Sequence, residues 1–146
     1  MSFGWGGGDV LAILQLAAKV YTGYKDAPND HKNIAEEVKS LEGIVNQAAK
    51  HFKHTPLSGN DRQVGQEALK SCQSVLEDLN SFVTKYKSLA STDKKLVFKR
   101  AKHGMEDIAT LRARLNTNAT LLSSFIRRFD ISTGITYYHI MLISLP

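Results

Sequence analysis

The chain has a single cysteine, Cys72, among its 146 residues, and this scarcity excludes an internal disulfide. Small secreted domains usually depend on several such bridges, so a secreted, disulfide-stabilised fold is not expected. The apolar stretch near the N-terminus has no basic segment before it and no small-residue cleavage site after it, which is a poor pattern for a signal peptide. We therefore expect an intracellular protein.

Groups that commonly build enzyme and metal sites are also sparse. The glycines of residues 4–8 are followed by no lysine and preceded by no strand, so they do not form a phosphate-binding loop. His51 and His54 are three residues apart, but a zinc site needs further ligands and none is suggested nearby. Cys72 falls on an apolar helical stripe, where a free cysteine usually acts as a small hydrophobic residue. We predict no catalytic residue, no metal site and no cofactor, hence no enzyme.

Positive charge is concentrated in one segment. The chain carries a net charge of +5, and residues 93–130 contain nine basic and four acidic residues, so the rest of the chain is neutral. Such a segment indicates either a polyanionic partner or a solvated helix face without a partner. Phe98 lies among the basic residues, but a nucleic-acid stacking surface needs several exposed aromatics along a groove. The candidates for contact with anionic lipid or an acidic partner are Lys94, Lys95, Lys99, Arg100 and Lys102.

Apolar residues at alternating spacings of three and four predict three long amphipathic helices, at residues 31–52, 61–89 and 94–128. The second of them has the heptad rhythm of a coiled coil. The expected inner positions of the first are Ile34, Val38, Leu41, Val45, Ala48 and Phe52. Those of the second are Val64, Ala68, Cys72, Val75, Leu79, Phe82, Tyr86 and Leu89. Those of the third are Ala101, Met105, Ile108, Leu111, Leu115, Leu122, Ile126 and Phe129.

A fourth, N-terminal helix is expected at residues 10–24, where Asp9 can cap the first turn and Lys19 is the only charged residue. A helix that is apolar all round is either a central helix buried by three others or a helix that can be delivered to a membrane. Fifteen residues span roughly 22 Å at 1.5 Å per residue, which is short of the roughly 30 Å of a bilayer core. The sequence leaves both interpretations open.

Residues 131–146 contain no Lys, Arg, Asp or Glu and are rich in β-branched and aromatic residues. This composition favours a single strand or an irregular tail. The sequence thus predicts an all-α protein, an antiparallel bundle of four main helices in residues 1–130, followed by an apolar strand-like or irregular tail in residues 131–146.

Three segments resemble the fungal HeLo-like domains that often precede the nucleotide-binding module of fungal NOD-like receptors. They are the opening MSFGWGGGDVLAILQLAAKVYTGYKDAP, the segment NIAEEVKSLEGIV and the segment IATLRARLNTNATLLSSFI. The similarity covers roughly residues 1–128 and is carried mostly by apolar spacing and the Phe-Gly start. The apolar tail has no counterpart in that family.

The resemblance implies a helical bundle that executes programmed cell death in heterokaryon incompatibility or innate defence. In that family the N-terminal apolar segment is thought to leave the bundle after oligomerisation and to attack the plasma membrane. Carried over to this chain, the membrane-interacting residues would be Phe3, Trp5, Val10, Leu11, Ile13, Leu14, Leu16, Val20 and Tyr21. The implied partners are a second copy of the chain, anionic membrane lipids and a nucleotide-binding receptor, and no nucleic acid.

The first hypothesis is therefore a membrane-targeting cell-death effector or signalling domain, cytoplasmic at rest and at the plasma membrane when activated. The alternative is a non-lytic helical adaptor or oligomerisation domain that only contacts other helices. The effector hypothesis requires the N-terminal segment for lipid binding, whereas the adaptor hypothesis does not.

Overall fold

The computed structural model describes residues 8–27, 31–54, 57–89 and 108–144. Within these ranges the secondary structure consists of four helices and no strand: α1 (Gly8–Tyr24), α2 (Lys32–His54), α3 (Gly59–Leu89) and α5 (Ile108–Ser144). The side chains described extend to Lys85 in α3 and to Phe129 in α5. The predicted all-α class is thus confirmed for the part of the chain that the structure describes.

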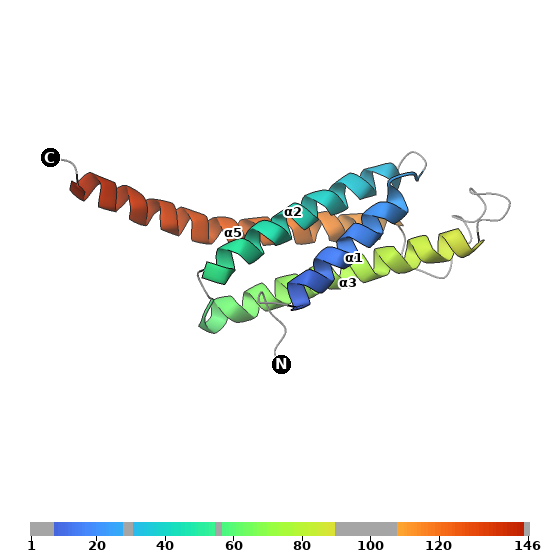
Figure 1. Cartoon of the computed structure of the whole chain (residues 1–146), viewed down its shortest axis with the longest axis horizontal. Helices are drawn as coiled ribbons and strands as arrows, with labels where there is room; N and C mark the ends of the chain where they lie inside the picture. Colours follow the sequence, from blue (N-terminus) through green and yellow to red (C-terminus); the bar gives the residue numbers. More distant parts are fainter. Residues whose placement is uncertain (1–7, 28–30, 55–56, 90–107, 145–146) are drawn as a thin grey trace.

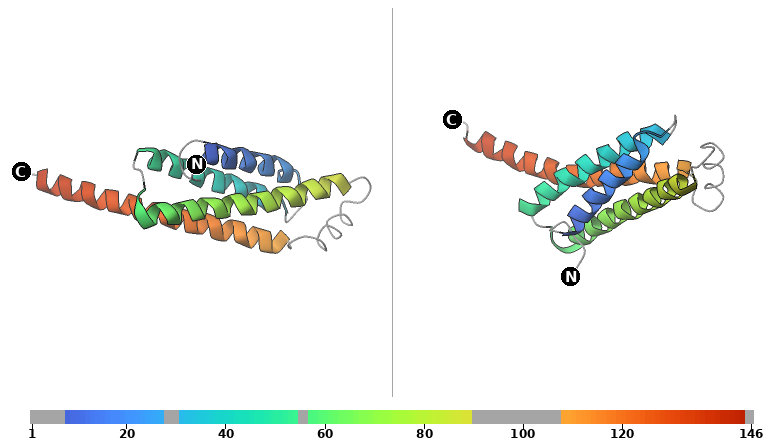
Figure 2. Two further views of the ribbon diagram at one scale, coloured as in Figure 1. Left: turned by 90° about the horizontal axis from the view of Figure 1, so that it is seen from below. Right: turned by 45° about the vertical axis from the view of Figure 1, so that its right-hand side comes forward.

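The four helices pack as a bundle in which successive helices run in opposite directions (Figure 1). α1 packs mainly against α2 and α3, and α5 packs mainly against the same two helices from the other side. α1 and α5 therefore occupy one diagonal of the bundle, and α2 and α3 occupy the other (Figure 2). As a result, α2 and α3 each contact both α1 and α5.

α2 follows the predicted pattern completely, because all six of its expected inner residues are buried. In α3, Cys72, Val75, Leu79 and Phe82 are buried as predicted, but Val64 is 39% exposed. The periodicity missed three further buried residues of α3, namely Leu69, Leu76 and Val83. A single stripe of positions therefore underestimates the width of the face that α3 buries.

In α5, Leu111, Leu115, Leu122 and Ile126 are buried as predicted, while Ile108 and Phe129 are partly buried against the core. Phe125, which the spacing missed, is also buried. The predicted start of this helix, with Ala101 and Met105, lies outside the described residues. So do the candidate contacts Lys94, Lys95, Lys99, Arg100 and Lys102.

The interpretation of the N-terminal helix as a central helix buried on every side is wrong. α1 buries one face, formed by Val10, Ile13, Ala17, Val20 and Tyr24. Leu11 on the opposite side is 56% exposed. Because α1 packs mainly against two neighbours, only the stripe directed at them is covered.

The prediction of a strand or irregular tail is wrong for residues 131–144, because α5 continues as one helix to Ser144. The preceding turns of α5 remove the cost of nucleating a helix, so each further residue need only extend it. Gly134 is tolerated within a helix, and the first proline after it is Pro146. The strand preference of β-branched residues depends on neighbouring strands, and the described residues offer none. The predicted boundary between residues 130 and 131 therefore falls inside a continuous helix.

The close approach of α1 to α3 depends on Gly23. A Cβ atom at this position would lie 3.0 Å from Cγ1 and 3.2 Å from Cγ2 of Val83. Gly43 in α2 is a matched contrast, because a Cβ atom there would meet nothing within 4 Å. Gly23 is therefore a packing requirement of the α1–α3 contact, whereas Gly43 is not.

We expect Gly43→Ala to raise the free energy of unfolding by about 0.5–1 kcal/mol, because alanine loses less backbone entropy in a helix. Gly23→Ala should fail to give this gain, and Gly23→Leu should lower the free energy of unfolding by about 1–3 kcal/mol through overpacking against Val83. Urea unfolding followed by circular dichroism measures all three. A Gly23→Leu variant as stable as the unmodified chain would contradict the packing described here.

Candidate functional site

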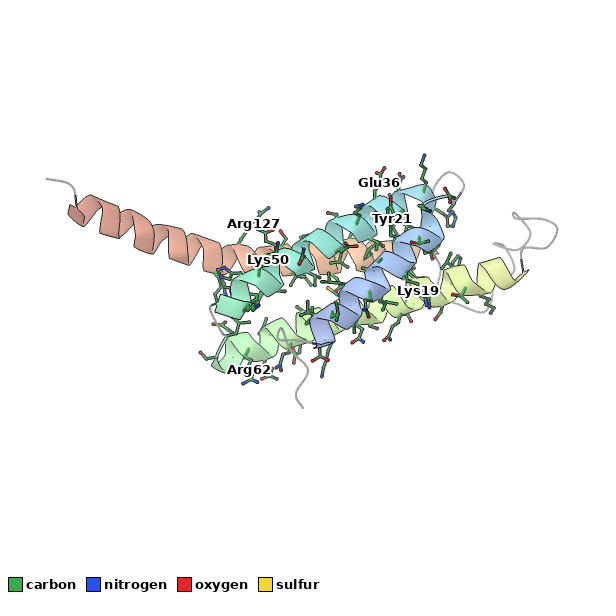
Figure 3. The ribbon with its side chains drawn as sticks, in the orientation of Figure 1. Lys19, Tyr21, Glu36, Lys50, Arg62 and Arg127 are labelled. Atoms are coloured by element: carbon green, nitrogen blue, oxygen red, sulfur yellow. The ribbon has the colours of Figure 1, made fainter. Side chains whose placement is uncertain are left out.

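The outward face of α1 is the first candidate surface. It consists of Leu11 together with small and polar exposed residues, Gln15, Ala18, Lys19 and Thr22. Tyr21 lies at its edge, partly buried, and the Lys39 ammonium of α2 lies 4.9 Å from its ring centroid. Figure 3 labels Lys19 and Tyr21 on this helix. The face is less apolar than the sequence suggested, and Leu11 is its one large exposed hydrophobic residue.

The C-terminal end of α1 is attached to α3. There the buried Tyr24 hydroxyl donates a hydrogen bond of 2.8 Å to the backbone carbonyl of Leu79, and Gly23 lies against Val83. Burial raises the pKa of the Tyr24 phenol well above its ordinary value. Near the other end of the helix, Val10 is buried and Leu11 is largely exposed.

Of the other predicted membrane-interacting residues, Val10, Ile13 and Val20 are buried in the bundle, while Leu14, Leu16 and Tyr21 are partly buried against its core. Phe3 and Trp5 lie outside the described residues. Among the helices that the structure describes, none combines the length and the apolar character that crossing a membrane requires.

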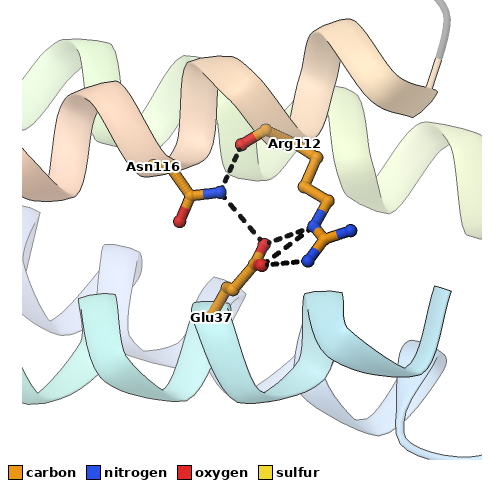
Figure 4. Close-up of polar contacts among 3 residues, drawn as sticks. All are labelled: Glu37, Arg112 and Asn116. Atoms are coloured by element: carbon orange, nitrogen blue, oxygen red, sulfur yellow. Dashed lines mark hydrogen bonds and ion pairs between the residues drawn. The ribbon is translucent and has the colours of Figure 1, made fainter. Parts of the chain in front are cut away.

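A polar cluster joins α2 to α5 (Figure 4). The Nε atom of Arg112 donates to both carboxylate oxygens of Glu37, at 2.8 and 3.1 Å, and its Nη2 atom lies 2.7 Å from Oε1. The Asn116 amide donates to the same carboxylate at 3.3 Å and to the Arg112 carbonyl at 3.0 Å. The Glu37 side chain is only 20% exposed. This two-pronged geometry fixes α5 against α2 at a defined register.

A second set of polar contacts joins α3 to α5. Nη1 of Arg114 lies 2.8 Å from a carboxylate oxygen of Asp78, and the Asn118 amide donates to the Ser71 carbonyl at 3.2 Å. Arg128 pairs with Asp61 near the start of α3. As the residue numbers rise along α5 they fall along α3, as an antiparallel pair requires.

These contacts change the interpretation of the basic segment. Three of its arginines, Arg112, Arg114 and Arg128, are paired with carboxylates of α2 and α3. Arg127 is exposed, as the view in Figure 3 shows. Arg112, Arg114 and Arg128 therefore hold the bundle together in addition to contributing positive charge.

A cluster of three phenylalanines marks the end of the bundle where α5 leaves it. Phe52 near the end of α2 packs against Phe125 and Phe129, with ring centroids 5.6 and 5.4 Å away. The Arg128 guanidinium lies 5.4 Å from the Phe129 ring centroid. Beyond this level the C-terminal part of α5 extends past the other three helices (Figures 1 and 2). The helical spacing did not reveal Phe125, which completes the cluster.

The side chains of Cys72 and His51, which could take part in catalysis or metal binding, are packed against other residues. Cys72 is buried, and this burial raises the pKa of its thiol from 9.0 to about 12. His51 packs edge-on against Phe52. Among the residues described, no group of three or more His, Cys, Asp or Glu side chains could hold a metal ion. The candidate sites among the described residues are therefore helix surfaces.

In comparisons with known proteins, no protein-family model, no curated protein and no solved structure matches the chain.

We expect the contact between Glu37 and Arg112 to contribute about 1 kcal/mol to the free energy of unfolding, at the upper end for a pair that is partly exposed. A double-mutant cycle with Glu37→Gln and Arg112→Gln isolates that coupling from other effects of each change. The matched cycle at Asp78 and Arg114 should give a smaller coupling, because the Asp78 side chain is 48% exposed. Equal coupling in both cycles would contradict a special role for the α2–α5 cluster.

Stability should decrease above pH 9. The folded chain holds the Cys72 proton up to about pH 12, whereas an unfolded chain with a thiol pKa near 9.0 loses it earlier. The unfolded state is thus favoured as the pH rises between these values, by up to about 1.4 kcal/mol per pH unit for one group. Urea unfolding at pH 8 and pH 10 measures the decrease. The Cys72→Ala variant should show a smaller one, and an equal decrease would assign the effect to other groups.

Proposed function

We propose that this chain is a membrane-targeting effector or signalling domain of the kind that acts in fungal incompatibility or innate defence. It would act by self-association and by release of α1 towards a membrane, as the resemblance to HeLo-like domains implies. The observation that carries the proposal is the placement of α1, the shortest of the described helices, which packs mainly against two neighbours. On its outward face, Leu11 is 56% exposed.

The energetics of α1 require a trigger. Its four large buried side chains are Val10, Ile13, Val20 and Tyr24. At about 1.5–3 kcal/mol for each such side chain, their exposure costs on the order of 6–12 kcal/mol. This cost is comparable with the whole stability of a small domain, about 5–15 kcal/mol. Release of α1 therefore has to be coupled to binding of a membrane, a receptor or further copies of the chain.

A non-lytic adaptor or oligomerisation domain is the second candidate. Two observations favour it: Arg112, Arg114 and Arg128 are used in contacts within the bundle, and α5 extends beyond the other helices. In this case α1 stays in place, and the partner is another helix. The two candidates differ in whether α1 contacts lipid.

We expect the purified chain to bind vesicles that contain anionic lipid and to release their contents, and we expect Leu11→Glu to reduce both by at least about tenfold. A carboxylate at this position is tolerated in water but is costly in an apolar lipid environment. Leu11 is 56% exposed, so the substitution should leave the bundle folded, which circular dichroism checks. Co-sedimentation and dye release measure the two effects.

Val64→Glu is the matched control, because it places the same charge at an exposed apolar position on α3. Leakage that Leu11→Glu removes and Val64→Glu retains supports the effector proposal. Binding and leakage unaffected by both changes would overturn the role of α1. Absence of binding to either neutral or anionic vesicles, with self-association retained, would favour the adaptor.

A further inference from the structure

One face of α5 is exposed along the whole bundle. It bears a row of small, uncharged residues at spacings of four, three and four, namely Ala113, Thr117, Thr120 and Ser124, and all four are exposed. The contacts of α5 with α2 and α3 come from the remaining faces, through residues such as Arg112, Leu115 and Asn118. We call this row the small-residue stripe. Leu121, which is 59% exposed, lies next to it, one turn from Thr117.

The extension of α5 continues the same face. Ile131 follows Ser124 by seven residues, which is two helical turns, and it is followed at spacings of four, three and four by Ile135, Tyr138 and Leu142. These four residues, the apolar stripe, occupy register positions on the face that the small-residue stripe begins. Residues 131–144 include no Lys, Arg, Asp or Glu, and this part of the helix extends beyond α1, α2 and α3.

We propose that the occupant of this face is α5 of a second copy of the chain, packed antiparallel in a twofold dimer. The inference rests on the self-association of the proposed function and names its surface. The two stripes have the same spacing read in either direction, so a single antiparallel register places each residue of the apolar stripe opposite a residue of the small-residue stripe. The pairs are Ala113 with Leu142, Thr117 with Tyr138, Thr120 with Ile135, and Ser124 with Ile131.

This self-complementarity selects a second copy over an unrelated helix. In a twofold interface each contact occurs twice, so four residue pairs yield eight contacts along the shared helix. Large side chains opposite small ones let two helices approach closely and interdigitate. Within one copy α2 and α3 pack against the other faces of α5, so none of the described helices covers this face. The dimer would bury the uncharged extension that a single copy leaves beyond its bundle.

The twofold axis falls between Arg127 and Arg128. In this register Arg127 of each copy lies opposite Arg128 of the other, and both arginines are exposed, Arg128 being paired with Asp61. Their repulsion weakens the dimer at low ionic strength and is screened by salt. Salt should therefore leave the dimer intact or strengthen it, whereas binding to anionic vesicles through basic residues should become weaker.

Analytical ultracentrifugation of the full chain at low and high salt tests the association. We expect a dimer whose dissociation constant rises at least about tenfold when Thr117→Glu and Thr120→Glu are combined, because the interface would then hold unpaired carboxylates. Both positions are exposed in a single copy, so the fold should survive. Ser40→Glu, at an exposed position of α2, is the matched control and should leave the dimer unchanged.

Single cysteines test the register under mild oxidation. Arg127→Cys should cross-link two chains efficiently, because the residue lies beside the twofold axis. Ala113→Cys should not, because the two copies of residue 113 are 29 positions apart in this register, or roughly 43 Å along the helix. Combining Ala113→Cys with Leu142→Cys should restore cross-linking. Cys72 is buried with a raised thiol pKa, so it should not compete.

A chain that stays monomeric, a dimer indifferent to the two glutamates, or equal cross-linking at positions 113 and 127 would each overturn the proposal. These outcomes are separable from the fate of the proposed function. Vesicle leakage by a monomeric chain would overturn the dimer and leave the effector role standing. A dimer with the expected cross-links but without vesicle binding would support this inference while overturning the effector role.

Discussion

The attachment of α5 to both α2 and α3 is the constraint on which the bundle depends. Burial of Leu111, Leu115 and Leu122 supplies apolar contact, but apolar side chains alone tolerate sliding by one turn. The polar contacts of Arg112 with Glu37 and of Arg114 with Asp78 distinguish the correct register from its neighbours. Once α5 is fixed in this way, α2 and α3 form the groove into which α1 packs from the opposite side.

The sequence predicted what a repeating apolar pattern determines. All six expected inner positions of α2 are buried, and Ala35 beside them is buried as well. α3 was predicted less well, since it buries Leu69, Leu76 and Val83 in addition to the expected stripe. Val64 was predicted to be buried and is exposed. An apolar residue at the expected helical spacing is buried only where a neighbouring helix covers it. Periodicity identifies faces and does not show where the neighbouring helices end.

The candidate surfaces were harder to predict for a physical reason. The near absence of charge in α1 left open a helix buried by three others or a helix delivered to a membrane, whereas the structure gives it one covered face and an outward face of small and polar residues around Leu11. The arginines of α5 looked like a free basic surface, but their carboxylate partners lie 75 and 36 residues away in the sequence for Arg112 and Arg114. Long-range pairing of this kind leaves no local pattern. The strand preference of residues 131–144 was likewise a local signal, overridden by the helix that precedes them.

Release of α1 and binding of a partner at the extension of α5 differ in the free energy that they cost. α1 is held by buried side chains, and exposing them would cost a free energy comparable with that of unfolding a small domain. The helix therefore remains in place until another interaction compensates for this cost. The extension of α5 differs in its position, because its helix extends beyond the other three described helices (Figure 1). A partner can therefore bind the extension without first breaking the fold. If both elements act in one protein, association through α5 is the step that precedes any release of α1, since it is the one that costs no core burial.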